Sequence, residues 1–211
     1  MKLKKIASLA LAGIMAVSML AGCKDGASSN TTDEPDVAPV TNAAAVVNGE
    51  LDNNEEKISF TDNTVLADLI ANYYKENPIK STDWTAGNTS LTGVGANALL
   101  NAAQKMLGVD ATGANLEDIS NKNTSKKTYL DVYYVNSDFV TKNDALRMAG
   151  QLVDGLNLPA DNKTTPGGVT VAATHDYSYT GSVAAIEAES KGGTESVWVI
   201  AIVITQTASE K

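Results

Sequence analysis

The chain is poor in the residues that build metal sites, disulfides and nucleophile pairs, with one cysteine and one histidine among 211 residues. A disulfide framework, a Cys/His zinc site and a Cys–His nucleophile pair each need partners that this sequence lacks. Basic residues are also in the minority. The net charge is −9, and it becomes −12 without the first 22 residues, whereas a nucleic-acid binder should carry the opposite sign. We therefore expect no metal, no cofactor and no nucleic-acid partner.

A long apolar run occurs at the N-terminus, where Lys2, Lys4 and Lys5 precede the segment Ile6 to Leu20. A basic start followed by an apolar stretch is typical of a secretory signal. The stretch is shorter than the roughly 20 residues that a membrane-spanning helix needs. The pattern therefore predicts a signal peptide over residues 1–22 rather than a permanent transmembrane anchor.

The four residues Leu20-Ala21-Gly22-Cys23 follow this run directly. They resemble the lipobox of bacterial lipoproteins, and the resemblance covers residues 1–23 only. It implies that Cys23 is acylated through its sulfur and becomes the mature N-terminus. Acyl chains bind a bilayer with about 0.8 kcal/mol per buried CH₂, so the resemblance implies a palmitate-anchored protein on the extracytoplasmic face of the cell membrane. An ordinary signal peptide with an incidental cysteine is the alternative.

The next segment is acidic and poor in core-forming residues. Residues 24–57 carry eight acidic and two basic side chains, two prolines and no aromatic residue. This composition predicts a disordered tether over residues 23–57, with an end-to-end distance of roughly 30 Å. A small apolar island at Ala43–Val47 leaves open a contact with the domain that follows. We expect residues 58–211 to form one globular domain.

Helical periodicity appears three times in that domain. The spacing predicts helices over about 62–76, about 93–107 and from Thr141 to about Leu156, the last with Thr141 as its N-cap and Asp144 at its third position. The segment Thr128 to Val135 is β-branched and aromatic and predicts a strand.

Near the C-terminus the apolar period changes from 3.6 to 2, which predicts strands over 169–179, 182–190 and 195–205. Two-residue turns are expected at Thr180-Gly181 and Gly192-Gly193. The second turn pairs Ile186 with Val199, and the first places His175 opposite Ile186. The sequence thus predicts an α+β fold with a largely antiparallel sheet of about four strands and about three helices packed on it.

No catalytic set emerges from these segments. His175 and Asp176 are neighbours on a predicted strand, so their side chains point to opposite faces. The carboxylates nearest the predicted sheet show no spacing that identifies an acid–base pair; they are Asp131, Asp138, Asp176 and Glu187. Aromatic rings and the single imidazole are the candidates for ligand contact, namely Trp84, His175 and Tyr177.

The leading hypothesis is a membrane-anchored extracytoplasmic lipoprotein whose domain binds or scaffolds an envelope protein, a peptide or a glycan without catalysis. Two alternatives stay open. One is a small cell-envelope hydrolase that uses paired carboxylates, and the other is an accessory subunit of an envelope assembly.

Overall fold

The structure is a computed structural model that describes residues 42–79, 89–93, 98–108, 115–164, 170–189 and 196–211. All of these residues belong to one compact unit, Val37–Lys211. The predicted signal peptide, Cys23 and the first part of the predicted tether lie outside the described residues.

Five strands form a single sheet with the order β1-β4-β5-β3-β2. Strand β1 pairs in parallel with β4, and the other three neighbouring pairs are antiparallel. The α+β class is confirmed, and the sheet is largely antiparallel as predicted, but it is mixed and has five strands rather than about four. The strands are β1 (Phe60–Asp62), β2 (Thr92–Gly93), β3 (Lys127–Asn136), β4 (His175–Glu189) and β5 (Ser196–Glu210).

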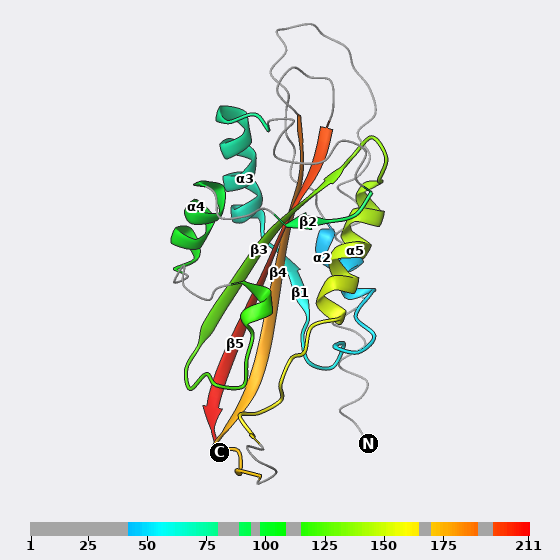
Figure 1. Ribbon diagram of the computed structural model, residues 1–211. Coiled ribbons are helices and arrows are strands. Elements are labelled where there is room, and N and C mark those ends of the chain that lie inside the picture. Colours follow the sequence, from blue (N-terminus) through cyan, green and yellow to red (C-terminus); the bar gives the residue numbers. More distant parts are fainter. Residues whose placement is uncertain (1–41, 80–88, 94–97, 109–114, 165–169, 190–195) are drawn as a thin grey trace, which may run out of the picture. The chain divides into compact units, whose positions relative to one another are not determined.

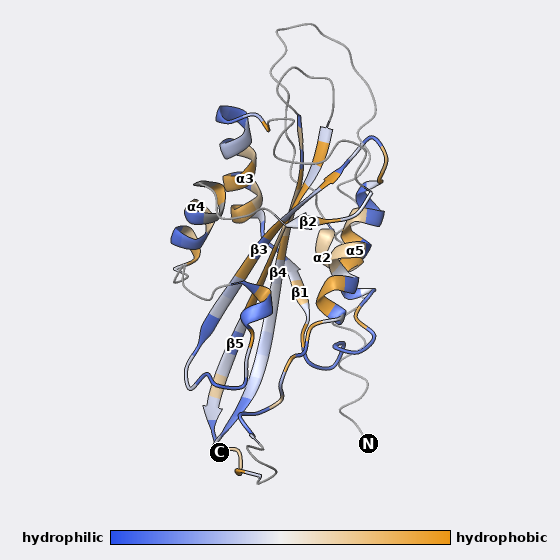
Figure 2. Cartoon of the chain, viewed as in Figure 1, coloured by the Kyte–Doolittle hydropathy of each residue, from blue (hydrophilic) through white to orange (hydrophobic). Residues whose placement is uncertain are grey.

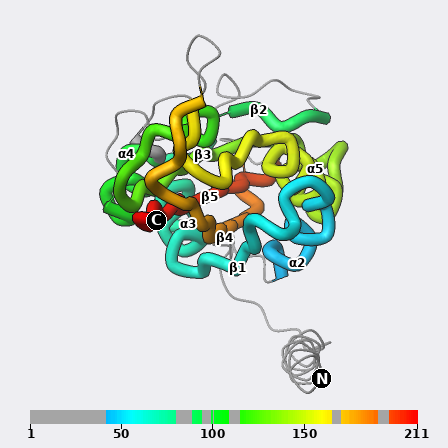
Figure 3. The backbone as a smooth tube through the Cα atoms, turned by 90° about the horizontal axis from the view of Figure 1, so that it is seen from below, coloured from blue at the N-terminus to red at the C-terminus, as the bar shows by residue number. Residues whose placement is uncertain are grey.

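Helices cover both faces of this sheet, as Figures 1 and 3 show. Helices α2 and α5 pack with one set of buried strand residues, whereas α3 and α4 pack with the alternate set. Strand β5 contributes Ile200 and Ile202 to the first core and Val199 and Ala201 to the second, which explains why it is apolar on both sides. The helices are α2 (Ala43–Asn48), α3 (Thr64–Glu76), α4 (Ala98–Leu107) and α5 (Lys142–Asp154), and a short 3₁₀ helix, η1, spans Leu116–Asp118.

One of the three predicted helices begins at its predicted cap, and the helix predicted over about 62–76 begins two residues later, at Thr64, after Asn63 rather than after the possible caps Thr61 and Asp62. The Thr141 side chain accepts a hydrogen bond from the Asp144 N–H at 3.2 Å, as predicted for α5. Helix α3 is capped by Asn63, whose side chain accepts from the Leu66 N–H at 2.9 Å. The second predicted helix begins five residues late, at Ala98, because Thr92 and Gly93 pair with β3 instead.

The predicted pairing of the last two strands is confirmed. Ile186 lies opposite Val199, and Ala184 lies opposite Ala201. The turn predicted at Thr180-Gly181 is wrong, because β4 runs without interruption from His175 to Glu189. Without that turn His175 pairs with Glu210. His175 and Ile186 are eleven positions apart along β4, an odd offset, so the two side chains lie on opposite faces of the sheet rather than together.

The predicted tether boundary at residue 57 is also wrong, because residues 43–57 belong to the folded unit. Ala43, Val47 and Leu51 are buried in the core beside α5. The Asn54 side-chain amide donates to three carbonyls at the end of α5, those of Val153, Asp154 and Leu156, at 3.0–3.1 Å. This contact stabilises the helix end, since the last carbonyls of a helix have no partner within it.

Candidate functional site

The sheet extends well beyond the two helices that cover one of its faces. Figure 1 shows α3 and α4 against the upper part of the strands, while the lower parts of β4 and β5 continue past them. In Figure 2 the same strands change from apolar near the helices to more polar at the lower end of the sheet, where β4 begins and β5 ends. This polar half of the sheet is the candidate site, and its two faces differ in construction.

The face that continues from under α3 and α4 is lined by hydroxyl side chains. They alternate along the strands with residues of the opposite face, as the pleat requires. Four of these residues are exposed and the rest are half-buried. We call this surface the hydroxyl face, and it consists of Thr61 of β1, Ser178, Thr180 and Ser182 of β4, Thr205, Thr207 and Ser209 of β5, and Thr128 of β3.

Strand pairing places these hydroxyls in rows across the sheet. Thr205 lies between Thr128 and Thr180, and Ser178 lies opposite Thr207. The hydroxyl oxygens of Thr128 and Thr205 are 3.0 Å apart, within hydrogen-bond distance. Neighbouring rows along a strand are about 6.6–6.8 Å apart and neighbouring strands about 4.8 Å apart. The result is a two-dimensional array of donors and acceptors.

Directly behind this array lies the fully buried Gln206, on the reverse face that α2 and α5 cover elsewhere. Its amide nitrogen donates to the Ser120 carbonyl at 3.0 Å and to the Tyr179 hydroxyl at 2.8 Å. Its oxygen accepts from the Tyr129 hydroxyl at 3.4 Å and from the Asn123 amide. A buried amide with all its hydrogen-bonding positions filled holds the surrounding chain in one arrangement.

Tyr177 and Tyr179 of β4 each hydrogen-bond to a loop on the same reverse face. The Tyr179 hydroxyl donates to the Pro159 carbonyl at 2.7 Å, and the Tyr177 hydroxyl donates to the Asn123 carbonyl at 2.8 Å. Burial raises the pKa of Tyr179 to about 12 and raises the pKa of Tyr177. Both hydroxyls therefore stay protonated at neutral pH. Tyr177, a predicted ligand-contact residue, uses its hydroxyl to hold a loop.

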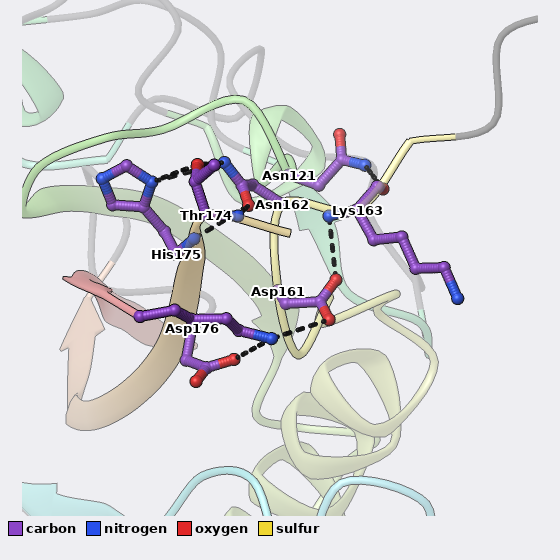
Figure 4. A network of polar contacts seen from close by, with 8 residues as sticks. Asn121, Asp161, Asn162, Lys163, Thr174, His175 and Asp176 are labelled. Atoms are coloured by element: carbon purple, nitrogen blue, oxygen red, sulfur yellow. Dashed lines mark hydrogen bonds and ion pairs between the residues drawn. The ribbon is translucent and has the colours of Figure 1, made fainter. Parts of the chain in front are cut away.

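His175, also predicted to contact a ligand, lies at the start of β4 in the polar network of Figure 4. Its Nδ1 is 2.9 Å from the Thr174 hydroxyl oxygen and 3.3 Å from the Asn162 amide nitrogen. Its backbone N–H donates to the Asn162 side-chain oxygen at 3.0 Å. These contacts tie the start of β4 to the preceding loop, and they place His175 at the end of the sheet, opposite Glu210 rather than Ile186.

The same network includes the last residue of the chain. The Lys211 ammonium lies 3.0 Å from an Asp176 carboxylate oxygen and 3.7 Å from one of Asp161. The hydrogen bond with Asp176 is the main cause that raises the pKa of Lys211. Exposed ion pairs of this kind contribute little stability, but this pair neutralises Asp176, which lies beside Ser209.

The four carboxylates considered from the sequence do not converge. Asp131 and Glu187 share the reverse face, but strand register separates them by four residues along the sheet, about 13 Å. Carboxylate pairs in glycosidases lie about 5–10 Å apart. Asp176 belongs to the other face, and Asp138 follows the end of β3.

Burial raises the pKa of Asp131, whose carboxylate accepts hydrogen bonds from the Leu116 N–H and the Tyr133 hydroxyl.

Sequence reasoning missed the hydroxyl face, although its signal is visible in the printed sequence. Ser178, Thr180 and Ser182 alternate along one strand, and Thr205, Thr207 and Ser209 alternate along its partner. The incorrect turn at residues 180 and 181 divided the first of these runs. The other two candidate residues, Trp84 and the predicted lipid acceptor Cys23, lie outside the described residues.

Within the described ranges, no group of three or more His, Cys, Asp and Glu residues is arranged to hold a metal ion. None of the helices described here has the length and apolar character needed to cross a membrane. Comparison with models of known protein families gave no match. The searches of curated proteins and of solved structures gave no match either.

Proposed function

We propose that this protein is an extracytoplasmic lipoprotein, anchored to the cell membrane through Cys23, whose folded domain binds a partner without catalysing a reaction. The observation that carries the proposal is the order of features at the N-terminus. A basic start, an apolar run and Leu20-Ala21-Gly22-Cys23 follow one another in the way that a lipoprotein signal requires.

The architecture of the domain supports a binding role. Its sheet is covered by helices on both faces over one half, whereas the other half leaves the hydroxyl face accessible. Buried hydrogen bonds centred on Gln206 support that face from behind. A rigid surface binds a partner with a smaller loss of conformational entropy than a loose one.

Lipid labelling in a bacterial host tests the anchor. Cells that express the full chain are grown with a palmitate analogue that can be detected after gel separation. The native chain is expected to carry the label and to fractionate with membranes. Cys23→Ser should lose both properties, because serine has no thiol to accept the lipid. Gly22→Ala is the matched control, since it keeps a small residue before Cys23, and it should be labelled like the native chain.

Two results would contradict the anchor. Label that persists in Cys23→Ser would show that the lipid is attached elsewhere. Native chain that is unlabelled and found in the cytosol would show that residues 1–23 do not act as a lipoprotein signal.

A further inference from the structure

We propose that the hydroxyl face binds an uncharged polysaccharide, with the Ser and Thr hydroxyls of β4 and β5 hydrogen-bonding to the sugar hydroxyls. This inference deepens the proposed function and rests on it for one point only, that the domain lies outside the cytoplasm, where such polymers are found. The binding itself is a property of the folded domain.

The hydroxyl face has unused hydrogen-bonding capacity. Within the described part of the chain, no side-chain or backbone group hydrogen-bonds to the hydroxyls of Ser178, Thr180, Thr207 or Ser209. Each hydroxyl can donate one hydrogen bond and accept two. Sugar hydroxyls have the same dual capacity, so a chain of sugars can match an array of this kind over several rows.

The charge of the surface favours a neutral partner. Nine strand residues lie on this face outside the part that α3 and α4 cover, namely the eight residues of the hydroxyl face and Asp176. Asp176 is the one charged residue among these nine. Its charge is matched by Lys211 at 3.0 Å. Residues 58–211 as a whole carry a net charge of −6, so an anionic polymer would be repelled at long range. The face also has no apolar patch of the size that protein interfaces use.

Hydrogen bonds on the reverse face of the same strands hold the hydroxyl array in a fixed arrangement. Gln206 lies between Thr205 and Thr207 along β5, and its four hydrogen bonds join β4, β3 and the loop near Ser120. Tyr177 and Tyr179 tie two further segments to this side. The strands are thereby held at fixed spacing, and a ligand does not have to order them on binding.

The arrangement also predicts the mode of recognition. Tyr177 and Tyr179 lie on the reverse face, so the tyrosines of β4 do not offer rings to a sugar on the hydroxyl face. Binding would depend on many hydrogen bonds to neutral groups, each of modest net value. Affinity should therefore increase with the length of the polysaccharide, and single sugars should bind weakly.

Co-sedimentation with insoluble polysaccharides tests the proposal. The full chain, purified in detergent micelles, is mixed with cellulose, chitin, curdlan or mannan, and with calcium alginate as the anionic comparison. We expect at least one neutral polysaccharide to remove the chain from solution and alginate to leave it there. The double variant Thr180→Val/Thr207→Val should bind about tenfold more weakly, the loss expected from two neutral hydrogen bonds.

Two further variants separate loss of the site from loss of folding. Thr180→Ser/Thr207→Ser keeps both hydroxyls and should restore most of the binding. Thr164→Val/Thr170→Val changes two exposed threonines that lie outside the five strands and should bind like the native chain. Thermal unfolding of each variant shows whether the domain is intact.

Several outcomes would overturn the proposal. They are the absence of binding to every neutral polysaccharide, stronger binding to alginate, and binding that the Thr→Val double variant leaves unchanged. The full chain with Cys23→Ser should bind polysaccharide as the native chain does. If the native chain carries no lipid label but binds polysaccharide, the proposed anchor is wrong and the proposed binding by the hydroxyl face is supported. If the native chain carries the label but binds no neutral polysaccharide, the anchor is supported and the proposal for the hydroxyl face is wrong.

Discussion

The ring of Phe60 lies directly against Gly181, where strand β1 pairs in parallel with β4. A Cβ atom added to Gly181 would lie 2.7 Å from two atoms of that ring, a distance that ordinary packing does not allow. The glycine is therefore required for the close approach of an aromatic side chain. It does not form the turn that the Thr180-Gly181 pair suggests in the sequence.

Gly181→Ala should destabilise the domain by about 1–3 kcal/mol, because the added methyl group overpacks the Phe60 contact. Chemical denaturation measures the free energy of unfolding. Adding Phe60→Leu should recover part of this loss, since it makes room for the methyl group, and a double-mutant cycle would show the coupling. Gly155→Ala, whose nearest contacts would be at 3.5 Å, should change stability little. Equal effects at the two glycines would argue against the steric explanation.

Asn54→Ala should destabilise the domain by about 2–3 kcal/mol, because three carbonyls at the end of α5 lose their shared donor. Asp52→Ala, an exposed neighbour, is the control and should stay close to native stability. A disordered tether predicts no effect from either change. A large loss for Asn54→Ala alone would therefore confirm that residues 43–57 are part of the folded unit.

Gln206→Leu tests the support behind the hydroxyl face. The substitution keeps the approximate side-chain volume but removes hydrogen bonds to Ser120, Tyr179 and Tyr129. Leaving buried polar groups without partners should lower the free energy of unfolding by about 2–3 kcal/mol. Amide hydrogen exchange of β4 and β5 should accelerate near the polar end of the sheet more than under the helices. Uniform exchange along both strands would contradict a local role.

Alkaline pH should destabilise the domain through its buried tyrosines. Burial raises the pKa of Tyr179 from 10.0 to about 12, so the folded state keeps a proton that the unfolded chain releases. The associated stability is fully present below pH 10 and is lost as the pH rises toward 12. Two pH units correspond to about 2–3 kcal/mol for this group.

Urea denaturation at a series of alkaline pH values measures this loss. Tyr179→Phe, which cannot ionise, should be less stable at neutral pH but should show a shallower decline above pH 10. An unchanged slope in the variant would assign the decline to other groups, such as Tyr129, whose pKa burial also raises.

Much of the fold could be predicted from local features of the sequence. Thr141 caps α5 because the hydroxyl and the Asp144 N–H are close in the chain. The pairing of Ile186 with Val199 followed from alternation and from the turn expected at Gly192-Gly193, which lies outside the described residues, because the position of a turn determines strand register. The burial of β5 on both faces followed from its continuous apolar run.

Contacts between residues far apart in the chain decided the rest. Gly181 has the same local signature whether it forms a turn or receives a ring, and Phe60, 121 residues earlier, determines which. Residues 43–57 have the composition of a tether, yet they fold because α5, about 100 residues later, covers their few apolar side chains and uses Asn54 as its cap. The sequence alone shows alternating hydroxyls on β4 and β5. Their accessibility depends on where α3 and α4 end, and only the tertiary structure determines that.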